Sequence, residues 1–406
     1  MTAIPQRQKQ RALVALCCGI VAALLLPAGL VIGFNSALNS EAGTNLNNVR
    51  TLKIPSTPVA LLATVNSASE VTSVNIIALS GSSLGGTIIS VPAKSMAEIL
   101  DGEEPRRISD SYTGVDASAF VADVEGLLDV SFSAVGILGR TDLIALFEPV
   151  GPTELLLDSD VRNTESDGAT RTVAKLGRAT VETNTLVDIL LAREIDQGEF
   201  KRFNHQKSVL TAIANTVGLG LKIESDTTTI ESPTDINAFV DRLLSGPIQV
   251  WQFAASQVAK GDLNPDGVDM YQLDNAEVTM IMASVAPTSI TGTGVAGQVS
   301  VQVDSPFNNA VVSREMVRRL LAAGLNVSLV REVPGPPADI TSIRYIDGNV
   351  LLAVGDVSLY VGETFAERTS ERAQGIDVQI VIGASFAKFL ESNPEIPTAT
   401  LSVGDE

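Results

Sequence analysis

The sequence predicts an α/β protein, because short apolar runs with strand character alternate with segments of helical periodicity. Residues 58–65, 73–80 and 85–92 are rich in Val and Ile, and Pro92 ends the third run. These three runs are predicted as buried strands. Residues 118–130 follow with apolar side chains three and four positions apart, which predicts a helix. Such alternation is typical of a layered α/β domain.

The alternation continues along the chain. Residues 132–139 are predicted as a strand and residues 141–151 as a helix. The polar, glycine-interrupted residues 158–179 predict a loop or hairpin. Two amphipathic helices follow at residues 183–194 and 200–218. Thr183 or Asn184 is suited to cap the first of them.

The remaining chain predicts a second, smaller α/β unit. Residues 235–259 have helical character and residues 271–285 are predicted as a strand. Residues 288–298 are small and glycine-rich, which predicts a linker. After the linker, strand and helix patterns alternate through residues 299–394, and one predicted helix is closed by Gly324. Residues 395–406 form a tail. The main unit is therefore predicted at residues 57–287.

The N-terminal region predicts a membrane anchor. Residues 12–34 carry no charge, and 23 apolar or small residues of this kind are enough to cross a bilayer. Basic residues occur within residues 1–11 and then not until Arg50, which predicts a cytoplasmic N-terminus, a stalk at residues 35–56 and an extracytoplasmic main part. The alternative is a cleaved signal peptide.

Composition excludes some function classes. The net charge of −19 is unfavourable for binding a nucleic-acid backbone. The two cysteines, Cys17 and Cys18, are adjacent, which is unsuited to a disulfide or a zinc site. Any anionic ligand must therefore be held by a local cluster of basic side chains.

One turn contains candidates for such a cluster. A predicted helix ends at Arg193, Asp196 and Glu199 follow, and Arg202 lies near the start of the next helix with Gln206 one turn later. A bidentate arginine and the amides of a helix start are both suited to phosphate. The alternative is an ordinary solvated surface with weak ion pairs. His205, beside acidic neighbours, is expected as a surface or capping residue.

Several segments occur in one order along the chain. They are the strand pair at residues 73–95, the stretch ISDSYTGVDASAFVADVEGLLDV, the stretch VGILGRTDLIALFEPVGPTELLLDSDV and the turn described above. This order resembles the LytR-CpsA-Psr family of bacterial cell envelopes. Residues 299–394 resemble an accessory domain found in some members. The resemblance implies a three-layer α/β/α domain with a mixed central sheet. It also implies a long apolar pocket for a polyprenyl-pyrophosphate-linked glycan, which is transferred to peptidoglycan or another wall polymer.

The resemblance implies that Arg193, Arg202 and Gln206 bind the pyrophosphate, with Asp196 or Glu199 as the acid. Other family motifs are degenerate. Thr72, Ser73, Val74 and Asn75 stand where the family has an arginine and an acid, and Ala93 replaces a phosphate-binding arginine. Lys94, Arg106 and Arg107 are candidates to replace the lost charge, although for Arg106 and Arg107 an exposed loop pair is the favoured alternative.

Two functions follow from these observations. The first is binding of a lipid-linked glycopolymer for its attachment to the wall, with Mg²⁺ implied if the chain is catalytic. No metal site and no other cofactor is predicted, because Val74 replaces the acid that would help to hold Mg²⁺. The second is a catalytically inactive relative that binds lipid or glycan, or acts as a scaffold in envelope assembly. The catalytic residues are undetermined at this stage.

Overall fold

The computed structural model describes residues 50–396, except for residues 82, 100–103, 166, 195–197, 222–232 and 292–298. The predicted cytoplasmic segment, residues 1–11, and the predicted membrane helix, residues 12–34, lie outside the described residues, as does residue Asp196. Among the described helices, none is both long enough and apolar enough to cross a bilayer. The membrane anchor therefore stays a prediction.

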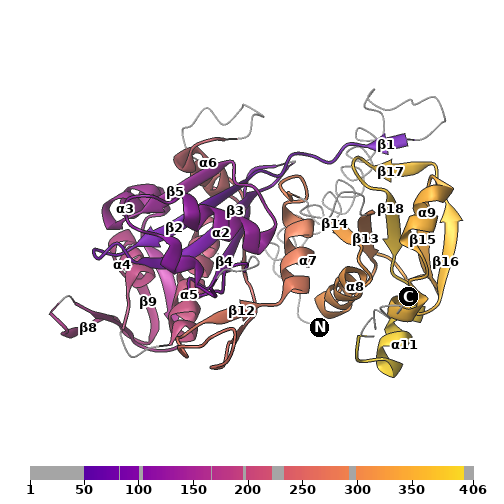
Figure 1. The fold of residues 1–406 in the computed structure, drawn as a ribbon. Coiled ribbons are helices and arrows are strands. Elements are labelled where there is room, and N and C mark those ends of the chain that lie inside the picture. The colour runs from indigo at the N-terminus through magenta and orange to yellow at the C-terminus, as the bar shows by residue number, and fades with distance from the viewer. Residues whose placement is uncertain are drawn as a thin grey trace, which may run out of the picture.

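A five-stranded mixed sheet forms the centre of the first unit, in the order β10-β4-β3-β2-β5. Figure 1 labels four of its strands, β2, β3, β4 and β5. The three Val- and Ile-rich runs form three adjacent strands of this sheet, as the sequence predicts. β3 is antiparallel to both of its neighbours, whereas the pairs β10-β4 and β2-β5 are parallel. The carboxyl ends of four strands therefore lie at one edge of the sheet. The strands are β2 (Val59–Val65), β3 (Val71–Leu79), β4 (Gly86–Val91), β5 (Ala134–Leu138) and β10 (Ile248–Gln252).

Helices cover both faces of this sheet. Side chains alternate between the two faces, so Leu61 and Ile76 belong to one hydrophobic cluster and Leu62 and Ile77 belong to the other. α2 and α7 bury their apolar residues in the first cluster, and α3, α4, α5 and α6 in the second. The predicted α/β class with a mixed central sheet is confirmed. The helices are α2 (Ser118–Leu128), α3 (Arg140–Phe147), α4 (Thr183–Leu191), α5 (Glu199–Val217), α6 (Ile236–Leu244) and α7 (Asn275–Val285).

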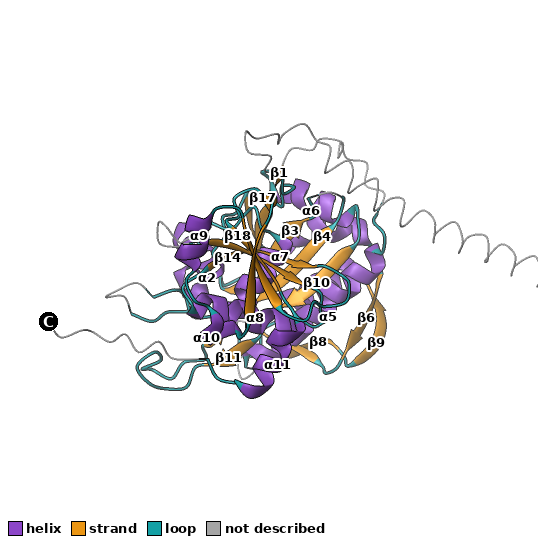
Figure 2. Ribbon diagram, turned by 90° about the vertical axis from the view of Figure 1, so that its right-hand side faces the viewer, coloured by secondary structure: helices purple, strands orange, loops and turns teal. Residues whose placement is uncertain are grey.

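Short ribbons lie outside the central sheet. The polar segment predicted as a loop or hairpin contains the antiparallel pair β7-β8, and the strands on either side of it form the pair β6-β9. Figure 2 shows β6 and β9 side by side at the edge of the molecule, near α5. The bounds of these elements and of the remaining short ones are β6 (Thr153–Leu157), β7 (Val161–Thr164), β8 (Thr170–Ala174), β9 (Gly177–Val181), β11 (Ala255–Gln257), β12 (Tyr271–Leu273), η1 (Ile108–Ser111) and η2 (Glu148–Val150).

The C-terminal part contains a second five-stranded mixed sheet, in the order β14-β13-β18-β15-β16. Gly324, with φ of +77°, follows α8 as the sequence predicts. The elements are β13 (Ser300–Ser305), α8 (Ala310–Ala322), β14 (Asn326–Glu332), β15 (Thr341–Tyr345), α9 (Gly348–Val354), α10 (Ser358–Val361), β16 (Thr364–Arg368), β17 (Glu371–Ala373), β18 (Val378–Val381) and α11 (Ala384–Ser392).

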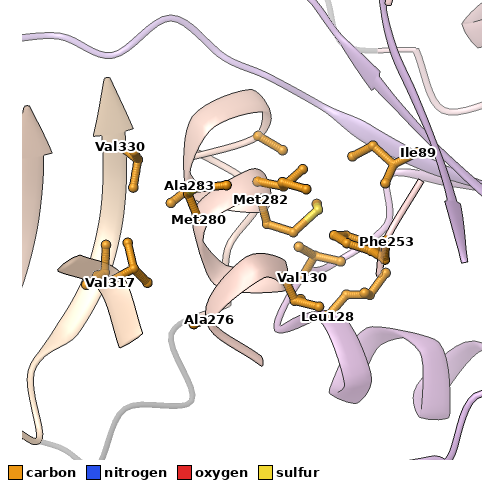
Figure 3. Packing of buried hydrophobic residues seen from close by; sticks show 14 of the residues in the cluster. Ile89, Leu128, Val130, Phe253, Ala276, Met280, Met282, Ala283, Val317 and Val330 are labelled. Atoms are coloured by element: carbon orange, nitrogen blue, oxygen red, sulfur yellow. The ribbon is translucent and has the colours of Figure 1, made fainter. Parts of the chain in front are cut away.

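The two sheets share one hydrophobic cluster, with α7 between them. Figure 3 shows Phe253 and Val130 on one side of α7 and Val330 on the other. Met282 and Ala283 on α7 are both buried in this cluster. The side chain of Arg318 on α8 forms an ion pair of 2.6 Å with Asp274, the N-cap of α7. The first unit and the C-terminal unit are therefore packed together through a common core.

Some sequence predictions differ from the structure. Residues 271–285 contain mainly a helix, because Asp274 accepts hydrogen bonds from the first amides of α7 and starts it there. Within residues 235–259 the helix ends at Leu244, and β10 and β11 follow. The N-cap of α4 is Glu182, without a side-chain capping bond. Finally, β1 (Arg50–Leu52), in the predicted stalk, pairs with β17 of the C-terminal unit.

Candidate anion-binding site

The start of α5 lies against the central sheet near the carboxyl ends of β4 and β10. Gln252, the last residue of β10, donates a hydrogen bond of 3.0 Å to the main-chain oxygen of Phe203 on α5. Farther along α5, Val209 and Ile213 pack in the apolar cluster on the sheet face that α5 covers. In open α/β sheets, ligands bind at the carboxyl ends of the strands. The structure therefore brings the predicted turn to an edge where a ligand site is expected.

The sheet surface that faces α5 changes from apolar to polar at this edge. Ser90 donates a hydrogen bond of 2.8 Å to Asn75, and Asn75 donates one of 3.2 Å to Ser73. The hydroxyl groups of Ser73 and Thr64 lie 2.7 Å apart. All four side chains are buried. Ser73 and Asn75 on β3 therefore belong to a neutral hydrogen-bond chain, which satisfies their polar groups without a ligand.

Arg202 and Glu199 form a buried ion pair on the first turn of α5. Arg202 Nη2 lies 2.5 Å from Glu199 Oε2, and the two side chains are only 9% and 3% exposed. Glu199 Oε1 also accepts a hydrogen bond of 2.9 Å from the main-chain N–H of Ala93. Arg202 Nε is buried and has no hydrogen-bond partner among the described residues. The alternative prediction of a solvated surface is wrong for this pair.

Gln206 lies on the same face of α5 as Arg202, one turn later. Its side-chain amide donates a hydrogen bond of 2.8 Å to the main-chain oxygen of Thr72 on β3. Arg202 and Gln206 continue the helix stripe occupied by Val209 and Ile213, at intervals of four, three and four residues. This spacing is a sequence signal that both polar side chains face the protein interior.

Lys94 joins the site through a second acid. Its ammonium group lies 2.7 Å from Asp269 Oδ2, and the same carboxylate accepts a hydrogen bond of 3.4 Å from the main-chain N–H of Glu199. Asp269 therefore accepts a hydrogen bond from a first-turn amide of α5. The N-cap residue Gly198 cannot do so, because it has no side chain. Burial and a hydrogen bond with Asp269 raise the pKa of Tyr271 to about 12. The Tyr271 hydroxyl consequently stays protonated at physiological pH.

Arg193 lies on the solvent side of the site. Its guanidinium contacts the carboxylate of Glu70, and the two side chains are 38% and 48% exposed. The hydrogen bond from Arg193 is the main cause that lowers the pKa of Glu70, and the charge of Arg202 contributes to the same shift. Both arginines of the predicted turn therefore act on one carboxylate. Glu70, Asp269 and Tyr271 were not predicted as site residues, and their distance along the sequence leaves no local signal for them.

The other predicted cations have partners of their own. Arg106 forms a two-point ion pair with Asp123 on α2, with nitrogen to oxygen distances of 3.1 Å and 2.6 Å. Arg107 pairs with Asp110, 2.7 Å away. Both of these acids lie on elements other than α5, namely α2 and η1. Of the three candidates for the lost charge, Lys94 is the one that joins the start of α5, through Asp269.

His205 is buried rather than exposed. Its side chain is 3% exposed, and Nε2 lies 2.9 Å from the hydroxyl of Ser159. Burial lowers the pKa of the imidazole, against the opposing attraction of Asp158. The expectation of a surface or capping histidine is wrong, because positions 202, 205, 206 and 209 all lie on the buried side of α5.

Two further features of the described residues bear on the ligand. No group of three or more His, Cys, Asp or Glu side chains in this part of the chain is arranged to hold a metal ion. A groove of about 620 Å³ lies on the other side of α5, lined among others by Lys207, Thr211 and Asn215. This groove contains none of the predicted site residues.

Comparisons with known proteins found similar solved structures. Neither a known protein family nor a curated protein sequence matches this chain. Several solved structures are similar in fold. TagV of B. subtilis has 13% identity and a TM-score of 0.41, over 55% of this chain and 94% of its own. TagT of B. subtilis has 18% identity and a TM-score of 0.40, over 56% of this chain and 88% of its own.

A third similar structure is described as the LytR-CPS2A-psr family protein YwtF (TagT) with bound octaprenyl pyrophosphate lipid. It has 17% identity and a TM-score of 0.39, over 55% of this chain and 86% of its own. The family that the sequence motifs resemble is thus also found among the similar folds. At these levels of identity, the likeness concerns the fold over little more than half of this chain.

Proposed function

We propose that this protein is a membrane-anchored, extracytoplasmic cell-envelope protein of the LytR-CpsA-Psr type, which binds a polyprenyl-pyrophosphate-linked glycopolymer. The proposal rests on the sequence motifs and on one structural observation. Arg202 is buried at the start of α5 with an unsatisfied Nε, and Arg193 pairs with Glu70 on the solvent side, where the charge of Arg202 also lowers the pKa of the Glu70 carboxyl. The two arginines carry the forked donors that suit a pyrophosphate.

The charge balance of the site favours binding over transfer. Lys94, Arg193 and Arg202 are paired with Asp269, Glu70 and Glu199, respectively. Phosphoryl transfer requires positive charge that is free to stabilise the charge developing on phosphate oxygens. Ala93 stands where the resemblance implies a phosphate-binding arginine and Val74 where it implies an acid, so two groups that transfer would use are replaced. We therefore favour the catalytically inactive relative among the two functions predicted from the sequence.

The binding proposal is tested with the full chain in detergent and octaprenyl pyrophosphate as the probe. Arg193→Gln is the informative variant, because the exposed Arg193 can be changed without a buried charge being left unpaired. Loss of a charged hydrogen bond, worth about 1.5–3 kcal/mol, should weaken binding roughly 10- to 100-fold. Arg344→Gln is the matched control, since Arg344 forms a partly exposed pair with Glu367 in the second sheet. No binding by the wild type, or equal binding by both variants, would refute the proposal.

Transfer is tested separately, with a lipid-pyrophosphate glycan, Mg²⁺ and peptidoglycan as acceptor. We expect binding of the lipid without transfer of the glycan. Wild-type transfer that Arg193→Gln abolishes would instead establish the glycopolymer phosphotransferase as the correct function, with Mg²⁺ as its cofactor. The same lipid-binding measurement remains valid under both outcomes.

A further inference from the structure

The carboxylate of Glu199 lies where an anion bound to Arg202 would lie. It accepts hydrogen bonds from Arg202 Nη2 at 2.5 Å and from the Ala93 main-chain N–H at 2.9 Å. A guanidinium together with a main-chain amide is the donor set that proteins use for phosphate oxygens. Glu199 is 3% exposed, so its carboxylate occupies a protein-enclosed position rather than a surface one.

We propose that Glu199 is an intramolecular ligand of this anion site, and that it holds the place of one phosphate of an incoming pyrophosphate group. This inference rests on the proposed function and assigns to it a means of control. The pyrophosphate displaces the Glu199 carboxylate from Arg202 and from the Ala93 amide and takes over both contacts. Glu199 thereby lowers the affinity of the site for any anion that cannot displace it.

The surroundings of Glu199 favour its displacement. Arg202 Nε, also buried, has no partner among the described residues, so the pair with Glu199 leaves part of the guanidinium unsatisfied. A ligand with more oxygen atoms than a carboxylate can satisfy both sides of the fork. A buried ion pair also gains little net free energy, because the desolvation of both charges offsets their attraction.

A second carboxylate adds to this effect. Asp269 Oδ2 lies within hydrogen-bond distance of the Glu199 main-chain N–H, and the charges of Asp269 and Glu199 both contribute to the raised pKa of Tyr271. Lys94 and Arg202 are therefore balanced by two acids at the start of α5. A dianionic phosphate group gains a net positive environment there only when one of the acids withdraws. Of the two, Glu199 is the one that contacts Arg202.

The test uses Glu199→Gln and inorganic pyrophosphate as the probe. Glutamine keeps the size of the side chain and its acceptor for the Ala93 amide, but it removes the charge. We expect Glu199→Gln to bind pyrophosphate at least 10-fold more tightly than the wild type in calorimetric titration, and to show the larger thermal stabilisation by pyrophosphate. Arg202→Gln in the Glu199→Gln background should cancel this gain.

Glu367→Gln is the matched control. Glu367 also forms an Arg–Glu pair of 2.5 Å, with Arg344 of the second sheet, and the pair is partly exposed. Its removal changes the net charge by the same amount and should leave pyrophosphate binding unchanged. If Glu199→Gln fails to fold, Glu199→Asp serves instead. Its shorter carboxylate cannot bridge Arg202 and the Ala93 amide together, so tighter binding than in the wild type is expected there too.

The outcomes separate this inference from the proposed function. Equal pyrophosphate binding by the wild type and Glu199→Gln would show that Glu199 is only a structural partner of Arg202. Octaprenyl pyrophosphate binding by the wild type, and with it the proposed function, would be unaffected by that result. Conversely, an Arg202-dependent gain in Glu199→Gln, alongside a wild type that binds no lipid, would retain the inference and remove the proposed function.

Discussion

The side-chain amide of Gln206 donates a hydrogen bond of 2.8 Å to the main-chain oxygen of Thr72, which lies 134 residues earlier in the chain. This contact joins the first turns of α5 to β3 at the polar end of the sheet. Gln206 is buried. The predicted pyrophosphate ligand Gln206 therefore has a structural partner of its own.

Removal of this contact should destabilise the fold. Gln206→Ala leaves the buried Thr72 carbonyl without its side-chain donor, which costs about 1–3 kcal/mol. Urea unfolding followed by the fluorescence of Trp251 would measure this loss. Asn204→Ala, at an exposed position on the same helix, is the control and should change stability little. Wild-type stability in Gln206→Ala would mean that the bond contributes nothing net.

The buried pair of Arg202 and Glu199 should show strong coupling. Arg202→Met leaves the Glu199 charge buried and unpaired, which is expected to cost about 3–5 kcal/mol. Adding Glu199→Gln removes that charge while keeping an acceptor for Ala93, so the double variant should regain most of the loss. A double-mutant cycle from urea unfolding measures the coupling. Additive effects of the two substitutions would contradict a direct buried pair.

His205 should make stability fall as the pH drops below neutral. The imidazole titrates at about 6.5 in an unfolded chain, whereas burial lowers the pKa of His205 in the native state. Between these two values the unfolded chain binds more protons, so the free energy of unfolding decreases from about pH 7.5 downward and levels off below the native pKa. Urea unfolding across this range would measure the slope.

The variant His205→Gln isolates this effect, because His205 is the only histidine in the chain. Burial raises the pKa values of Asp241 and Glu277, and these groups contribute the opposite slope at lower pH. They are present in both proteins and cancel in the difference. A pH profile for His205→Gln that matches the wild type between about pH 7.5 and 6 would contradict the prediction.

The shared core predicts cooperative unfolding of both units. Met316→Ala on α8, a fully buried position in the C-terminal unit, should cost about 2–5 kcal/mol. Because the cluster continues through α7 into the first sheet, the fluorescence transition of Trp251 on β10 should shift with it. Leu352→Ala, at an exposed position in the same unit, is the control. If the Trp251 unfolding midpoint is the same in Met316→Ala and the wild type, the two units unfold independently.

Local pattern was sufficient for many elements and misleading for a few. The strands of residues 58–92 were predicted correctly because continuous Val- and Ile-rich runs bury both faces of a strand. Residues 271–285 were predicted as a strand, although Asp274 starts a helix there. Their side chains are apolar on several sides because α7 packs between two sheets, and a helix buried on all sides has little amphipathic period.

Some residues of the candidate site were likewise predictable from local sequence and others were not. Arg202 and Gln206 were predicted from the motif. Their helical spacing with Val209 and Ile213 indicates that both are buried. Their acidic partner Glu199 was predicted as one of two candidates for the acid of this turn, not as the carboxylate that pairs with Arg202. Asp269 and Tyr271 lie about 70 residues farther along the chain, and nothing local marks them as neighbours of α5.

The amino-acid sequence alone determined the α/β class, most strands and the stripe of α5, because these depend on periodic burial within a few residues. It also determined which basic side chains were available for an anion. Only the tertiary structure decided that Glu70 and Asp269 stand beside those cations, and that α7 joins two sheets in one core. Both depend on which distant segments meet, since ion pairing and burial act through space and carry no period along the chain.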